Sequence, residues 1–254
     1  NVYNGPVVNA AQGISMQVFN AVNKFSGGFY TAVQPQITKS YAEGHYQEAN
    51  KLVCDSSRLA FYLLLLIGLP ILSETDYILQ LWLHEIPAST VIFVKIIICF
   101  ALIEAFSQPL IYLMLATGKI RNYQIIVGTL CLLNFPVAWI ILYLGYPPTL
   151  AQSTIVLFSF LSLIVRVFML KKMTGLSINY FAFNTFGRAF VVTILSLIIP
   201  YIISIMYVEG LLRFLIGTLC SEFISIILIV ILGLNKEERL KVFNKLKHVF
   251  VYAK

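Results

Sequence analysis

Polar side chains recur along the first apolar stretch of the chain, and they are the residues best suited to contact a polar solute. In order along the chain they are Gln12, Gln17, Asn20, Asn23, Lys24 and Gln34. At about 100° per residue they fall on one rough stripe of a helix. Neutral amides both donate and accept hydrogen bonds, as sugar hydroxyls do. The pattern therefore favours contact with a hydroxylated solute, and Lys24 adds a group that attracts an anionic phosphate.

An amide without a partner in hydrocarbon costs several kcal/mol, so this stripe must face protein or water. Two interpretations stay open. The stripe borders a cavity that a solute crosses, or it makes hydrogen bonds between helices, each contributing about 1 kcal/mol. Its length exceeds one helix contact, which favours the cavity. Gly27 and Gly28 interrupt the same stretch and allow either bending or close helix approach.

Two carboxyl groups lie near the middle of apolar stretches, where ionisable groups are costly and usually functional. They are Glu104 and Glu222. One of them is a candidate for ion coupling through proton exchange. The alternative, a protonated or hydrogen-bonded packing role, stays open for both. Asp55 and Arg58 are three residues apart, a spacing that predicts a local ion pair on a helix.

The composition determines which solvent surrounds these residues. Of 254 residues 59% are hydrophobic and 11% are charged, whereas a soluble domain carries roughly 25% charged residues. Too few charges remain to cover a surface that faces water. Lipid must therefore be the solvent for most of the chain.

The elements that carry these side chains are expected to be transmembrane helices, which gives an all-α, polytopic fold. Seven stretches approach the length of about 20 apolar residues that a helical span needs. They are residues 9–32, 59–71 (extended by 54–58), 91–116, 125–144, 151–170, 187–207 and 211–234. We expect residues 1–172 to form five helices of one bundle, and residues 173–254 to add two helices and a basic tail.

Lys and Arg are concentrated in every second connection between spans, and so on one side of the membrane, as the positive-inside rule predicts for true spans. The N-terminus should face outward and the C-terminus the cytoplasm. The net charge of +7 is largely this bias, so a nucleic-acid partner is not indicated. Residues 74–83 and the tail, residues 235–251, are expected to lie at the membrane interface. Packing of the tail against its own protein is an equal alternative.

Catalysis has little support in the sequence. His45, His84 and His248 lie in loops or the tail, and nothing in the sequence marks any of them as paired with a carboxylate for general-base work. The four cysteines show no CxxC or Cys/His spacing, so no metal site or disulfide framework is indicated. No cofactor is expected.

Several motifs resemble one family of transporters. They are "GPVVNAAQGISMQV" (5–18), "QPQITKSYAEG" (34–44), "LQLWL" (79–83) followed by Ile86-Pro87, and "ATGKIRNY" (116–123). Together they are similar to the polysaccharide-exporting flippases, the O-antigen and lipopolysaccharide branch of the multidrug/oligosaccharidyl-lipid/polysaccharide (MOP) superfamily. The resemblance covers roughly residues 5–123.

This resemblance implies a MATE-like transporter of two bundles, of which the chain would be the C-terminal half. The partners it implies are membrane lipid, an undecaprenyl-type lipid-linked oligosaccharide and the missing N-terminal bundle. The implied setting is the bacterial inner membrane, where alternating access moves the lipid-linked sugar outward. Gln17, Asn20, Asn23 and Lys24 would then face the sugar or its pyrophosphate. The chain opens without Met, which also suggests a fragment, although a processed end is an alternative.

Three rival classes are weighed against the flippase. The chain lacks the Asp-Arg-Tyr and Asn-Pro motifs that a seven-helix receptor would carry. A glycan polymerase usually needs a longer outer loop than this chain has. A multidrug or cation antiporter of the same superfamily is the serious alternative. Its amphipathic cations suit acidic and aromatic groups, whereas the first helix offers amides and Lys24.

Overall fold

A computed structural model describes residues 5–208, 210–240 and 244, and every regular element in this part of the chain is helical. The contacts divide the chain into two compact units that meet in sequence between Phe186 and Gly187. Each unit is described by itself below. The prediction of an all-α, polytopic membrane protein is confirmed.

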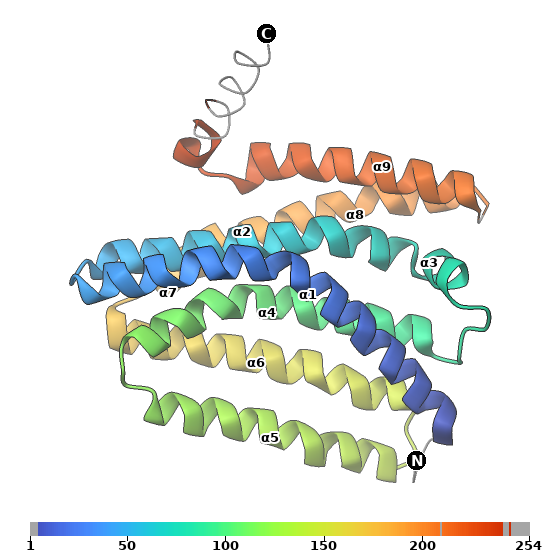
Figure 1. The fold of residues 1–254 in the computed structure, drawn as a ribbon, viewed down its shortest axis with the longest axis horizontal. Helices are drawn as coiled ribbons and strands as arrows, with labels where there is room; N and C mark the ends of the chain where they lie inside the picture. The colour runs from blue at the N-terminus through green and yellow to red at the C-terminus, as the bar shows by residue number, and fades with distance from the viewer. Residues whose placement is uncertain (1–4, 209, 241–243, 245–254) are drawn as a thin grey trace. The chain divides into compact units, whose positions relative to one another are not determined.

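The first unit contains six helices, one short helical turn and most of a π-helix (Figure 1). Their bounds are α1 Gly5–Ala42, α2 Tyr46–Ser73, α3 Thr75–Trp82, α4 Thr90–Ala116, α5 Arg121–Tyr143, α6 Pro148–Thr174, α7 Ile178–Tyr180 and η1 Phe181–Gly187. Helix α3 lies within the stretch that the sequence places at the membrane interface.

Helix α4 is the core of this unit because it packs against α1, α2 and α6. A helix that is apolar on all sides is either buried in protein or faces lipid. Most of α4 is buried in protein, and Ile97, Ile98 and Leu110 are fully so. Helix α5 lies at the periphery and packs mainly against α6. Its outward side chains, such as Leu132 and Phe135, are 74% and 77% exposed, as suits a helix whose outer side faces lipid.

Local sequence explains where α6 begins and ends. Pro148 stands in its first turn, where a missing N–H costs nothing. Gly175 ends it in the left-handed conformation with φ of 76°, and its N–H donates to the carbonyl of Lys171. A side chain at this position would be strained. The turn lets the chain continue into α7 and η1.

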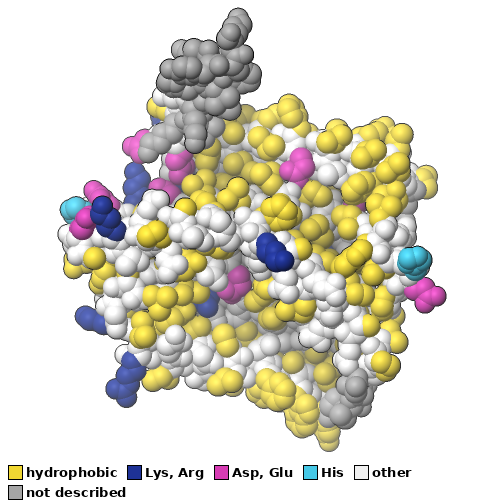
Figure 2. All heavy atoms as spheres, viewed as in Figure 1, with side chains coloured by type: hydrophobic (Ala, Val, Ile, Leu, Met, Phe, Trp, Pro, Cys, Tyr) yellow, Lys and Arg dark blue, Asp and Glu magenta, His cyan; other side chains and the backbone are white. Residues whose placement is uncertain are grey.

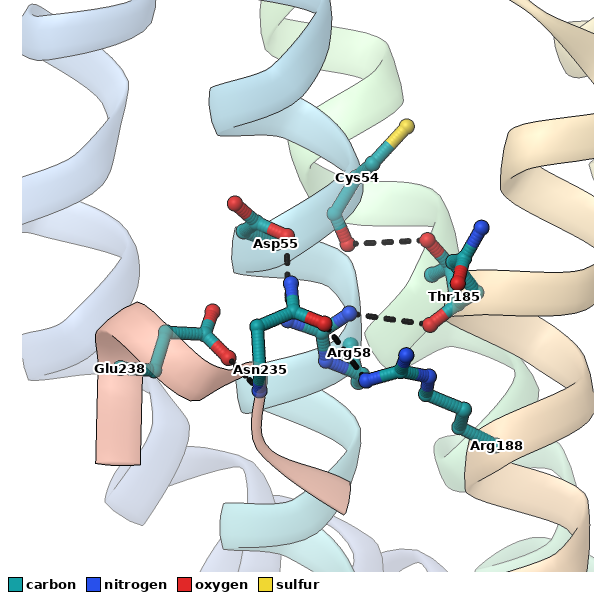
Figure 3. A network of polar contacts seen from close by, with 8 residues as sticks. Cys54, Asp55, Arg58, Thr185, Arg188, Asn235 and Glu238 are labelled. Carbon is teal, nitrogen blue, oxygen red and sulfur yellow. Dashed lines mark hydrogen bonds and ion pairs between the residues drawn. The ribbon is translucent and has the colours of Figure 1, made fainter. Parts of the chain in front are cut away.

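The π-helix η1 is tied to α2 by two hydrogen bonds within the first unit (Figure 3). Arg58 Nη1 donates to the carbonyl of Asn184 at 2.9 Å, and Thr185 Oγ1 donates to the carbonyl of Cys54 at 3.2 Å. Arg58 Nη2 also lies 3.0 Å from Asp55 Oδ1. The predicted ion pair between Asp55 and Arg58 is thus confirmed, and the same guanidinium holds the wide helical turn in place.

The second unit contains α8 Arg188–Met206, α9 Leu211–Leu228 and the π-helix η2 Ile229–Gly233. Helices α8 and α9 pack against each other. The buried side of α9 consists of Gly217, Ser221 and Ser225, and such small residues at four-residue spacing allow close approach of helices in a membrane. Arg188, the first residue of α8, donates from Nη1 to Oδ1 of Asn235, which follows η2, at 2.5 Å (Figure 3).

Six helices in the described residues are long and apolar enough to cross a membrane, against seven in the sequence prediction. The difference is α1, which has 38 residues but a lower hydropathy. Its polar side chains cause this, so α1 suits a membrane only if that side avoids lipid. The predicted interfacial tail, residues 235–251, lies mostly outside the described residues. In its described part, residues 236–240 and 244 are helical.

In the space-filling view, hydrophobic side chains cover much of the visible face (Figure 2). In the first unit, charged side chains gather mainly at the edge where α1 continues into α2 (Figures 1 and 2). A chain with charges at the helix ends and apolar residues between them fits a bilayer.

Candidate functional site

The polar stripe of α1 points away from the helices that α1 packs against. Five of the six side chains are exposed and one is half-buried. The exposed ones are Gln12, Gln17, Asn20, Lys24 and Gln34, and Asn23 is half-buried. We call these six residues the amide face. Whether it borders a passage for a solute stays a prediction.

The opposite side of α1 explains this orientation. Its buried residues recur at intervals of four and seven, the spacing of a helix seam. They are Ala11, Ser15, Val22, Ser26, Val33 and Ile37. Ser15 and Ser26 donate to the carbonyls of Gln12 and Asn23 in their own helix, at 2.8 and 3.1 Å. These small residues with satisfied hydroxyls allow α1 to pack closely against α4 and α2.

The amide face meets two hollows of the first unit. Gln17 lines a mostly apolar groove of about 410 Å³, together with Phe25 and Trp82. Gln12 and Asn9 line a second hollow of about 640 Å³ at the beginning of α1. We call the second hollow the amide–tryptophan cavity, because Asn134, Trp139 and Gln152 also line it. It combines side chains of α1, α4, α5 and α6.

Contacts within α5 and α6 hold the far wall of this cavity. Thr154 Oγ1 lies 2.7 Å from Asn134 Oδ1, which links α6 to α5. The rings of Trp139 and Tyr143 stack with centroids 5.4 Å apart and planes 20° apart. The Trp139 side chain remains 47% exposed. The wall therefore presents an aromatic ring and, at Asn134, an amide of restricted orientation.

Sequence reasoning did not select Asn134, Trp139 or Gln152. Two of them are single amides within apolar stretches, and this is the signal that could have identified them. Trp139 stands near the end of a span, where a tryptophan is usually assigned to the headgroup region. Only the packing of α5 and α6 places the three side chains opposite Gln12.

Glu104 lies between α4 and α6 rather than on the amide face. Its Oε1 accepts a hydrogen bond from Ser159 Oγ at 2.5 Å and lies 3.8 Å from Arg166 Nη1. Arg166 Nη1 also donates to Ser107 Oγ at 2.8 Å. A carboxylate that faces a buried guanidinium has its charge compensated. This arrangement favours the packing alternative for Glu104 over ion coupling.

Glu222 belongs to the second unit, in the middle of α9. It is half-buried, and its Oε1 is buried with no hydrogen-bond partner among the described residues. The Oγ atoms of Ser196 and Ser225, in the same unit, are buried in the same way. Such groups carry a desolvation cost. Glu222 therefore stays the better candidate for ion coupling.

Metal binding has no support in the described part of the chain, where no three His, Cys, Asp or Glu residues gather as possible ligands. The chemistry that the first unit offers instead is that of amides, hydroxyls and one aromatic wall. Amides and hydroxyls can both donate hydrogen bonds to a polar solute and accept them from it.

The described fold is that of a polytopic, all-α membrane protein. The MatE family model matches residues 2–140, more than half of the chain. The chain belongs to the MatE family, which places it among the membrane transporters of the MOP superfamily. No curated protein and no solved structure matches it.

Proposed function

We propose that this chain takes part in moving a lipid-linked oligosaccharide, such as an O-antigen, capsule or exopolysaccharide unit, from the cytoplasmic to the periplasmic leaflet. The observation that carries the proposal is the exposed amide face of α1. Its five carboxamides and Lys24 include no acidic group. Hydroxyl groups and a pyrophosphate are the chemistry that such a surface would bind.

The proposed mechanism is alternating access. The amide face would border a cavity shared with a second bundle, as the family resemblance implies, and would be reached in turn from each side of the membrane. The proposed setting is a bacterial inner membrane with the N-terminus of the chain outside. The undecaprenyl-type tail of the cargo would remain in lipid while the sugar crosses along the polar side of α1.

A multidrug or cation antiporter is the second candidate. The buried oxygen of Glu222 without a hydrogen-bond partner favours it, because a carboxylate in a membrane can exchange protons or bind cations. The amide face argues for the flippase, since amides and an ammonium group suit an organic cation poorly. Resistance of cells to cationic dyes, with and without the protein, would distinguish the two.

The test replaces Gln17, Asn20 and Asn23 together by Leu in the full-length protein as its gene encodes it. The assay is surface polysaccharide in a strain whose own copy of the gene is deleted. We expect export to be lost while the amount of protein in the membrane fraction is unchanged, because three hydrogen-bonding groups disappear from an exposed face. Normal polysaccharide in this variant would reject the proposal.

A matched control removes three exposed carboxamides that lie off the amide face. Gln36, Asn122 and Gln124 are exposed in the first unit. Replacing these three by Leu changes composition by the same amount, so export should continue. If both triple variants lose export equally, the effect is a general loss of polarity and the assignment of the amide face is wrong.

A further inference from the structure

The amide–tryptophan cavity has a lining whose charge and shape restrict what it can hold. Its volume of about 640 Å³ lies within the range of small-molecule sites, roughly 300–1,000 Å³. None of the described residues that line it carries a charge. A strongly ionic ligand would gain no compensating partner there, so the site favours a neutral one.

Four carboxamides from three helices converge on this cavity. Asn9 and Gln12 come from α1, Asn134 from α5 and Gln152 from α6. Each amide offers two N–H donors and an acceptor oxygen, so the group matches a ligand with several hydroxyls at different angles. A hydrocarbon chain would offer no hydrogen bond to the amides of Gln12 and Gln152, at a cost of about 1–3 kcal/mol each.

Trp139 supplies the complementary apolar surface. Its ring is stacked against Tyr143, the residue is 47% exposed, and it lines the cavity. A sugar ring has hydroxyls around its rim and apolar C–H groups on its faces. An aromatic plane flanked by amides fits such a ring, because both kinds of surface find partners at once.

We propose that the amide–tryptophan cavity binds an uncharged sugar ring of the transported glycan, with Trp139 against its face and Asn134, Gln152 and Gln12 at its hydroxyls. The inference rests on the proposed function for the identity of the cargo. It adds a second contact region, which shares Gln12 with the amide face and otherwise draws its polar groups mainly from α5 and α6, and a preference for neutral over acidic or amino sugars.

The position of the cavity also indicates at which stage of transport it would hold the sugar. It lies at the beginning of α1 and α6 and in the second half of α5. In the orientation that the Lys and Arg alternation predicts, these parts lie on the outer side of the membrane. The cavity would therefore hold the sugar after it has crossed, before release into the periplasm.

The chain's two tryptophans allow a direct measurement of binding. Trp139 and Trp82 are 47% and 50% exposed, but only Trp139 lines this cavity. The full-length protein is reconstituted into lipid nanodiscs, which avoids sugar-based detergents. The variant Trp82→Phe, which keeps Trp139, is titrated with methyl glucoside or N-acetylglucosamine to about 200 mM. Trp139→Phe, which keeps Trp82, is the matched control, and any tryptophans outside these 254 residues are replaced in both variants.

We expect a saturable change in the fluorescence of Trp82→Phe and none in Trp139→Phe. Adding Asn134→Leu or Gln152→Leu to Trp82→Phe should raise the dissociation constant about fivefold, the loss of one hydrogen bond. Glucuronate and glucosamine should bind at least about tenfold more weakly. No saturation, equal binding of the charged sugars, or an unchanged constant in both amide variants would overturn the inference.

The export assay separates this inference from the proposed function. If sugar binding at Trp139 fails while the Gln17, Asn20 and Asn23 variant still loses export, the cavity assignment is wrong and the flippase proposal stands. If sugars bind at Trp139 but that variant exports normally, the cavity assignment stands and the amide face is not the pathway.

Discussion

The ion pair between Glu104 and Arg166 provides a stability prediction that can be worked out from the structure. Arg166→Met removes the guanidinium that lies 3.8 Å from Glu104 Oε1 and 2.8 Å from Ser107 Oγ. The two paired side chains are 7% and 21% exposed, with Arg166 the more buried. The substitution leaves a carboxylate without its cation between α4 and α6.

The magnitude follows from distance and burial. At 3.8 Å and an effective dielectric constant of about 20, the Coulomb attraction is about 4 kcal/mol. Desolvation of both groups cancels part of it, and breaking a fully buried pair costs about 3–5 kcal/mol. Because Glu104 retains some exposure, we expect Arg166→Met to lower the free energy of unfolding by about 2–3 kcal/mol. That corresponds to a fall in Tm of roughly 4–12 °C.

The assay is a double-mutant cycle on the purified protein in lipid nanodiscs, read by thermal and denaturant unfolding. Glu104→Gln keeps an acceptor for the Ser159 hydroxyl but removes the charge. The double variant should be more stable than the sum of the single effects by about 1–2 kcal/mol. Arg121→Met, which removes an exposed arginine, should change stability by less than about 0.5 kcal/mol. Additivity of the two buried substitutions within about 0.5 kcal/mol would show that no ion pair exists.

Three further predictions concern other parts of the chain. Lys24→Ala should reduce glycan export more than Lys24→Arg, because only the second keeps a cation for a phosphate; equal export by both variants and wild type would argue against that contact. Glu222→Gln should flatten the dependence of transport on external pH if this carboxyl exchanges protons, and an unaltered pH profile would remove it as the coupling group. Gly68→Val should destabilise the protein by about 1–3 kcal/mol, since a Cβ at this position already meets Ile98 Cγ2 at 3.1 Å. Ile98→Ala in the same chain should recover part of that loss, and unfolding measurements with no recovery would refute the steric explanation.

The helical elements could be predicted because their signal is local. A run of apolar residues long enough to cross lipid identifies a span without knowledge of its neighbours. The predicted edges of α4 and α8 agree with the observed helices to within a residue. The same reasoning gave a short second span, whereas α2 continues from Tyr46 to Ser73. Its polar first half is helical because it packs in the first unit, where Val53 and Arg58 are buried.

The polar positions show where local reasoning stops. Helix periodicity alone placed Gln12, Gln17 and Asn20 on one side of α1, and that side is exposed. It gave no means of pairing Glu104 with Arg166, since the residues are on different helices. Nor did it relate Gln12 to Trp139.

The sequence by itself determined the solvent, the helices and the sidedness of α1, because composition and helical period are properties of a single segment. The tertiary structure decided which polar groups meet. That choice depends on how each helix is rotated about its axis and shifted along it when α4, α5 and α6 pack. A rotation of a few tens of degrees would turn Gln152 or Arg166 toward lipid. The free-energy cost of exposing a polar group to lipid sets the observed rotation, and it cannot be read from the sequence of one helix.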